Sequence, residues 1–80
     1  MPIVLRVGGF AFGIYLNDHP PAHVHVYYSG GSVVVELESE RFRDVRGMSK
    51  ADVNAAVRLA RAHHAELIAK WKLLHPDEET

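Results

Sequence analysis

Apolar side chains recur at every second position through most of residues 3–38, and this pattern constrains the fold more than any other feature. Alternate residues of a strand face opposite sides of a sheet, so the pattern predicts half-buried strands. Gly8-Gly9 and Ser29-Gly30-Gly31 interrupt it with residues typical of tight turns. We therefore expect an antiparallel meander of four strands, at about residues 3–7, 10–15, 23–28 and 32–38.

A long helix is expected to follow. Ser49 and Asp52 form the pattern of a capping box, and Pro76 is expected to end the helix. Between them, mostly apolar residues recur at alternating steps of four and three, which places them in one stripe along the helix. The members of this stripe are Val53, Val57, Ala60, His64, Leu67, Trp71 and Leu74. Residues 39–48 show no clear pattern, so Arg41-Phe42-Arg43 either extends the strand pairing or belongs to a loop.

These patterns predict the fold class α+β, with a four-stranded antiparallel meander sheet packed on one long C-terminal helix. We expect a single domain over residues 1–76, because a chain of 80 residues is too short for two cores. The acidic residues 77–80 are expected to fray. Such a small core also gives the chain reason to form a homodimer, through its sheet edges or an open face.

Composition excludes several classes of protein. The chain contains no cysteine, which rules out a disulfide framework and cysteine-ligated zinc and agrees with a cytoplasmic location. No apolar run resembles a signal peptide or is long enough to span a bilayer, so no membrane partner is expected. The formal net charge of −1 is unlike that of a dedicated duplex-DNA binder.

The segment His19-Pro20-Pro21-Ala22-His23-Val24-His25 is chemically the most unusual part of the chain. Residues i and i+2 of a strand project from one face, so His23 and His25 should lie side by side. Val24 and Val26 are the natural core residues of this strand. The two histidines are then expected on the opposite, open face, which they would share with Arg6, Tyr15 and Tyr27.

Two functions fit this arrangement, beside the simpler interpretation that the histidines are surface residues of a strand. Asp18, His19, His23 and His25 could together bind zinc or a similar divalent ion, because imidazole and carboxylate groups are ligands for such ions. Alternatively, His23 and His25 could act as catalytic acid and base in RNA cleavage, which requires no cofactor. In that case Arg6, Tyr15 and Tyr27 would bind phosphates and unpaired bases.

The remaining histidines are expected to be less important for function. His64 lies in the helical stripe, which predicts that it is at least partly buried as a neutral core residue. His63 and His75 are expected to be exposed to solvent. Trp71 is predicted to anchor the core near the end of the helix.

Several segments are similar to one known family. Asn17-Asp18-His19-Pro20-Pro21-Ala22-His23-Val24-His25-Val26 resembles the signature of the domain of unknown function 4160 family of small prokaryotic proteins, as do Pro2-Ile3-Val4-Leu5-Arg6, Gly8-Gly9-Phe10, Glu66-Leu67 and Trp71. The histidine spacing matches the family pattern. The prolines fall one place earlier, however, and Ala22 occupies the position of the second proline.

The resemblance implies a genetic arrangement rather than an established activity. Members are often encoded beside a second small protein, which suggests a toxin–antitoxin pair. Our leading hypothesis is therefore a toxin-like component that acts on RNA through His23 and His25. Its expected partners are a small antitoxin-like protein, a second copy of the chain, or both. The alternative is a non-enzymatic module that binds a metal or another protein, and the sequence leaves open whether the chain is an enzyme.

Overall fold

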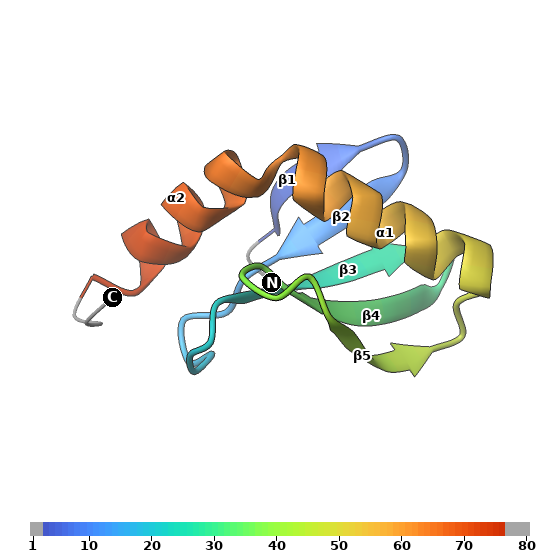
Figure 1. Cartoon of the computed structure of the whole chain (residues 1–80), viewed down its shortest axis with the longest axis horizontal. Helices are drawn as coiled ribbons and strands as arrows, with labels where there is room; N and C mark the ends of the chain where they lie inside the picture. Colours follow the sequence, from blue (N-terminus) through green and yellow to red (C-terminus); the bar gives the residue numbers. More distant parts are fainter. Residues whose placement is uncertain (1–2, 77–80) are drawn as a thin grey trace.

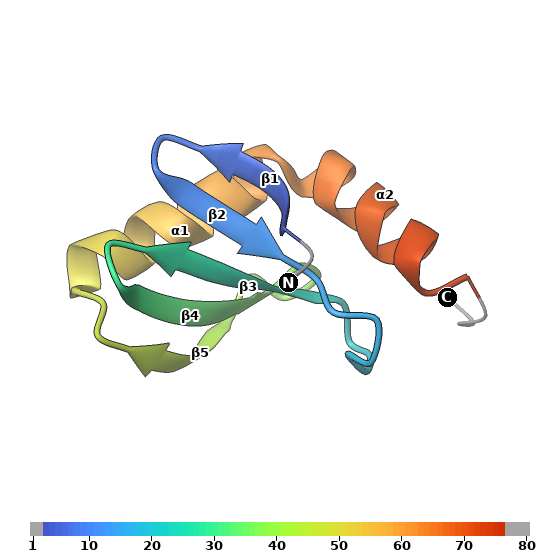
Figure 2. The same ribbon diagram turned by 180° about the vertical axis from the view of Figure 1, so that it is seen from behind.

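A five-stranded antiparallel sheet and two helices make up residues 3–76, the part of the chain that the computed structural model describes. Each strand pairs with the strand that follows it in sequence, in the order β1-β2-β3-β4-β5. Both helices lie on one side of the sheet, and α2 continues past its end (Figures 1 and 2). The elements are β1 Ile3–Val7, β2 Phe10–Gly13, β3 His23–Tyr28, β4 Gly31–Glu36, β5 Phe42–Arg46, α1 Lys50–Ala62 and α2 His64–Leu74.

Two tight turns connect the hairpins at the predicted places. Gly8 and Gly9 have φ angles of 53° and 84° between β1 and β2, and Ser29 and Gly30 have 51° and 83° between β3 and β4. Two successive residues with positive φ suit the turns that match the twist of a hairpin. Both predicted hairpins are therefore confirmed, although β4 begins at Gly31 and ends at Glu36.

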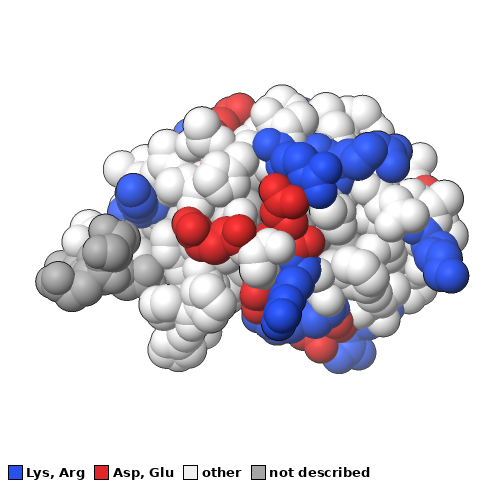
Figure 3. All heavy atoms as spheres, viewed as in Figure 1, with Lys and Arg blue, Asp and Glu red and all other residues white. Residues whose placement is uncertain are grey.

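The core lies between the sheet and the helices. Val24 and Val26 of β3 are fully buried in it, as the alternation predicts. Trp71 is 3% exposed, which confirms its predicted role as a core anchor. The other buried members of the core are Phe10, Phe12, Ile14, Val33, Val35, Leu37, Val53, Ala56, Ala60 and Leu67. Seen from the side of the helices, basic side chains lie over α1, and acidic side chains gather beside them near the middle of the view (Figure 3).

The fifth strand corrects the predicted sheet of four strands. β5 pairs with β4 from Phe42 to Arg46, but all its residues are exposed. The pairing shifts register between Ser32 and Val34, and Asp44 has a φ angle of 57°. A strand that buries neither face has no alternation of apolar and polar residues, so the periodicity could not reveal it. β2 is also shorter than predicted and ends at Gly13.

Two helices replace the predicted single long helix. α1 begins where expected, because the Ser49 hydroxyl accepts a hydrogen bond of 3.1 Å from the backbone N–H of Asp52. The helix is interrupted at His63, whose φ and ψ angles of −109° and 25° are not helical. Leu67 and Trp71, the stripe members within α2, are nevertheless buried as predicted. His64, the first residue of α2, is exposed, contrary to the predicted partial burial.

Some sequence-based expectations concern the ends of the chain or the membrane. Residues 77–80, predicted as a frayed tail, lie outside the described residues, as do residues 1–2. Within residues 3–76, neither helix has the length and apolar character needed to cross a membrane.

Leucine substitutions in α2 test how this helix packs. Leu67 is fully buried, whereas Leu73 is 71% exposed. We expect Leu67→Ala to lower the free energy of unfolding by about 2–5 kcal/mol, because it leaves a cavity in the core. Leu73→Ala is the matched control and should change it by less than about 0.5 kcal/mol. Urea denaturation followed by circular dichroism measures both, and equal effects would contradict the described packing of α2.

Candidate functional site

A turn from Tyr15 to Asp18 places the carboxylate of Asp18 at the end of the sheet. The backbone N–H of Asp18 donates to the carbonyl of Tyr15 at 3.1 Å. In the opposite direction, the backbone N–H of Tyr15 donates to Asp18 Oδ2 at 2.9 Å. Side chains of aspartate commonly stabilise turns in this way. The two bonds hold the Asp18 carboxylate beside the first residues of β3.

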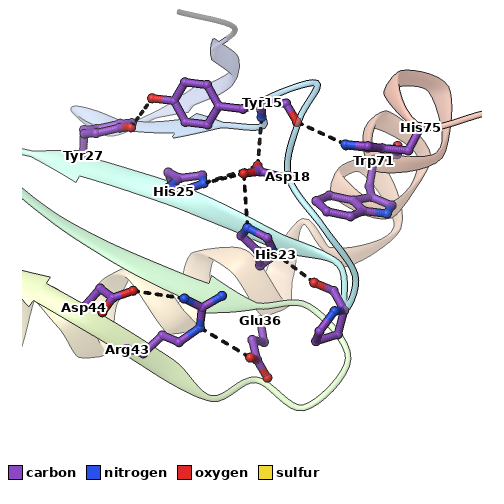
Figure 4. Close-up of polar contacts among 11 residues, drawn as sticks. Tyr15, Asp18, His23, His25, Tyr27, Glu36, Arg43, Asp44, Trp71 and His75 are labelled. Atoms are coloured by element: carbon purple, nitrogen blue, oxygen red, sulfur yellow. Dashed lines mark hydrogen bonds and ion pairs between the residues drawn. The ribbon is translucent and has the colours of Figure 1, made fainter. Parts of the chain in front are cut away.

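His23 and His25 of β3 both direct Nε2 toward this carboxylate (Figure 4). His23 Nε2 lies 3.5 Å from Asp18 Oδ1, and His25 Nε2 lies 3.3 Å from each carboxylate oxygen. One ligand atom from each of the three residues can be chosen such that all three lie within 4.8 Å of one another. Two imidazoles and one carboxylate thus converge on a single point.

The hydrogen bond at Nδ1 of His23 shows which tautomer the neutral ring adopts. Nδ1 lies 2.9 Å from the carbonyl oxygen of Pro21, which can only accept. Nδ1 must therefore carry a hydrogen. In the neutral ring, Nε2 then presents a lone pair toward Asp18, so an acceptor faces an acceptor. The arrangement is favourable when a positive species, either a proton or a metal ion, binds at His23 Nε2.

His23 is buried, which corrects the expectation that it lies on an open face. Its exposed fraction is 6%, although it shares its side of the strand with His25 and Tyr27. The indole ring of Trp71 contributes to this burial, with its centroid 5.2 Å from that of the imidazole. His25 is partly accessible, since 25% of its side chain is exposed. Solvent therefore reaches the cluster more readily from the side of His25.

His75 joins the end of α2 to the same turn, and it is partly buried rather than exposed as predicted. Its Nε2 lies 3.1 Å from the carbonyl oxygen of Tyr15, and its Nδ1 lies 2.9 Å from that of Trp71. Both partners are acceptors, so both bonds form only when both ring nitrogens carry a hydrogen. The positive charge of that form is also favourable near the C-terminus of a helix.

The predicted binding residues are partly brought together. The hydroxyl groups of Tyr15 and Tyr27 are 2.6 Å apart, and Tyr15 packs its ring against the edge of His25, with 4.7 Å between centroids. Arg6 is exposed on β1 and lines a pocket with Tyr27. Burial, followed by the hydrogen bond with Tyr15, raises the pKa of Tyr27 to about 12. Tyr27 is therefore a neutral phenol near neutral pH.

His19 does not join the cluster, although it was considered as a ligand together with Asp18. It is exposed, and it lines a pocket of about 380 Å³ between the turn and the end of α2. Sequence reasoning also missed the contributions of the Pro21 carbonyl and of His75. Contacts made by a backbone carbonyl leave no pattern in the sequence. For His75, the only signal in the sequence was its position beside Pro76 at the predicted end of the helix.

The pKa of the Asp18 carboxyl group is lowered from its ordinary value of 3.8. Burial alone would raise this pKa, but the hydrogen bonds from Tyr15 and His25 and the charges of His23 and His25 outweigh it. The ionised form is thus the one that the folded structure favours. This suits a residue whose role is to face positive groups.

Comparison with known proteins gives one finding. A family model described as "Domain of unknown function (DUF4160)" matches residues 9–72, which include the whole cluster. Searches among curated proteins and among solved structures found no match.

The lowered pKa of Asp18 predicts how stability depends on pH. A carboxyl group whose pKa is lower in the folded state adds stability above its unfolded pKa, and this stability is lost as pH falls through the folded pKa. We expect the wild type to lose stability below the ordinary value of 3.8, and Asp18→Asn to lose less over this range. Urea denaturation at a series of pH values measures the loss. Glu38→Gln removes an exposed carboxyl group as the control, and identical pH profiles for wild type and Asp18→Asn would contradict the prediction.

Proposed function

The chain belongs to the DUF4160 family, and we propose that it binds a divalent metal ion of the zinc type through Asp18, His23 and His25. The observation that carries this proposal is the convergence of the three side chains, with ligand atoms within 4.8 Å of one another. Imidazole nitrogen and carboxylate oxygen together form the donor set of many zinc sites.

The environment of His23 supports the proposal further. Histidines that bind metals nearly always donate their second ring N–H to a carbonyl or carboxylate, which orients the ring. The bond from His23 Nδ1–H to the Pro21 carbonyl has this character and leaves Nε2 free to bind an ion. The hydrogen bond from the Tyr15 N–H fixes Asp18 in the same way. Hydrogen bonds from backbone groups outside the proposed ligand set therefore orient both His23 and Asp18.

Three protein ligands leave at least one position of a tetrahedral ion open. This position would be taken by water or by a bound molecule, which can approach along the exposed side of His25. The arrangement is thus suited to binding a small ligand as well as to a structural role. His19, which is exposed and outside the cluster, is not part of the proposed ligand set.

The metal proposal takes precedence over the sequence-based hypothesis of metal-independent RNA cleavage. An acid and a base must both direct a ring nitrogen toward the substrate. Here both Nε2 atoms face Asp18, and His23 is only 6% exposed. Such a pair is poorly placed for direct proton exchange with a large substrate.

Zinc titration of protein without a histidine tag tests the proposal. We expect calorimetry to show one site with a dissociation constant below about 10 μM. Asp18→Asn and His25→Ala should each weaken binding by about 100-fold, because each removes a ligand. Affinity should also fall at acid pH, because protons compete for the two imidazoles.

Two histidines outside the cluster give matched controls for this titration. His19→Ala and His64→Ala remove exposed imidazoles and should leave the affinity unchanged. Cobalt(II) offers an independent readout, because its visible spectrum reports nitrogen and oxygen ligands. Loss of binding in His19→Ala equal to that in His25→Ala would reject the proposed ligand set, and absence of zinc binding by the wild type would reject the site.

The toxin-like role remains a prediction that rests on the family resemblance. It expects growth to stop when the chain is expressed without its neighbouring partner. The His23→Ala/His25→Ala double variant, produced at the same level, should restore growth if the histidines carry the activity. Normal growth of cells that express the wild type would contradict the toxin-like role. It would not bear on the proposal that the chain binds a metal ion.

A further inference from the structure

The side of the sheet opposite the helices carries two adjoining pockets (Figure 2 shows this side). One has a volume of about 270 Å³ and includes His25, Asp44 and Arg46. The other has a volume of about 480 Å³ and includes Arg6 together with the two hairpin turns. Tyr27 and Ser32 line both pockets. The two pockets therefore meet in the middle of the sheet, and together they form one hollow surface, which we call the open face.

Two arginines lie at opposite ends of one row across this open face. The pairing of neighbouring strands aligns the row as Arg6, Ala11, Tyr27, Ser32 and Arg46. It runs from β1 to β5, the two edge strands. Four strand spacings of about 4.8 Å separate its ends by roughly 19 Å at the backbone.

Both arginines are available to a ligand. Neither Arg6 nor Arg46 forms an ion pair with any residue in 3–76, whereas Arg43 contacts Glu36 and Asp44. The Asp44 carboxylate in the first pocket forms its ion pair with Arg43, with Asp44 Oδ2 3.0 Å from Arg43 Nη1. An unpaired guanidinium group beside a pocket is suited to bind a phosphate.

Tyr27 is half-buried, and its aromatic side chain lines both pockets midway between the two arginines. Its neighbours in the row, Ala11 and Ser32, have small side chains, and both line the pockets beside it. The hydrogen bond between the hydroxyl groups of Tyr27 and Tyr15 restrains the ring at its tip. Unpaired bases stack on such rings whatever their sequence.

We propose that the open face binds single-stranded nucleic acid, with phosphates at Arg6 and Arg46 and a base stacked on Tyr27. Alternating phosphate and base contacts in a shallow groove are the usual means of binding an unpaired strand. This inference extends the expected binding role of Arg6 and Tyr27 by adding Arg46 at the far edge. None of these three residues is a proposed metal ligand, although His25 of the metal site lines the same open face.

Fluorescence anisotropy with labelled oligouridine and oligodeoxyuridine of about ten nucleotides tests the proposal. We expect the Arg6→Ala/Arg46→Ala double variant to bind at least about 10-fold more weakly than the wild type. With two phosphate contacts, the slope of log K against log salt should be about −1.4, and the variant should lose most of it. Tyr27→Leu should weaken binding about 10-fold, and Tyr27→Phe should retain most of it. Tighter binding of one oligomer identifies the preferred sugar.

The control is the double variant Arg58→Ala/Arg61→Ala, which removes the same charge from α1 on the opposite side of the protein. It should bind as the wild type does. Equal weakening in both double variants would show that only net charge matters and would overturn the proposal. So would equally tight binding of duplex RNA, or the absence of binding at low salt.

Zinc affinity measured on the same proteins separates this inference from the proposed function. The Arg6→Ala/Arg46→Ala variant should retain the zinc affinity of the wild type, and circular dichroism should show that it is folded. Normal zinc binding without strand binding would overturn this inference alone. Strand binding without zinc binding would overturn only the metal site.

Discussion

The carboxylate of Asp18 is the group on which the described site depends. It accepts the backbone N–H of Tyr15 and faces Nε2 of both His23 and His25. These contacts join the turn after β2 to the beginning of β3. Trp71 and His75 close the same region from α2, by ring contact with His23 and by a hydrogen bond to the Tyr15 carbonyl. A single carboxylate therefore organises residues from distant parts of the chain.

Local spacing was sufficient to predict most of the sheet and the pair His23 and His25. Their i,i+2 positions in a strand with buried Val24 and Val26 required no knowledge of tertiary structure. The exposed strand β5 left no periodic signal, because neither of its faces is buried. The direction of His19 also could not be predicted, since it depends on the path of the loop after the Tyr15–Asp18 turn.

The burial of His23 depends on contacts that are distant in sequence. Trp71 reaches it from α2, which continues past the end of the sheet. A continuous helical stripe predicted that His64 faces the core, and the structure exposes it instead. Leu67 and Trp71 of the same stripe are buried as predicted. His75 was misplaced because its hydrogen bond to the Tyr15 carbonyl joins residues far apart in sequence. Periodicity therefore predicts which residues are helical more reliably than it predicts which residues they contact in the folded protein.

Nuclear magnetic resonance of the histidine ring nitrogens tests the central claim, that Asp18, His23 and His25 form one cation-binding cluster. Long-range proton–nitrogen spectra distinguish protonated from unprotonated ring nitrogens and can be recorded with and without zinc. The account predicts that His23 Nδ1 carries a hydrogen in both states and that zinc shifts Nε2 of His23 and His25 while leaving His19 and His64 unchanged. Protonation of His23 at Nε2 alone, or equal shifts at all four histidines, would contradict it.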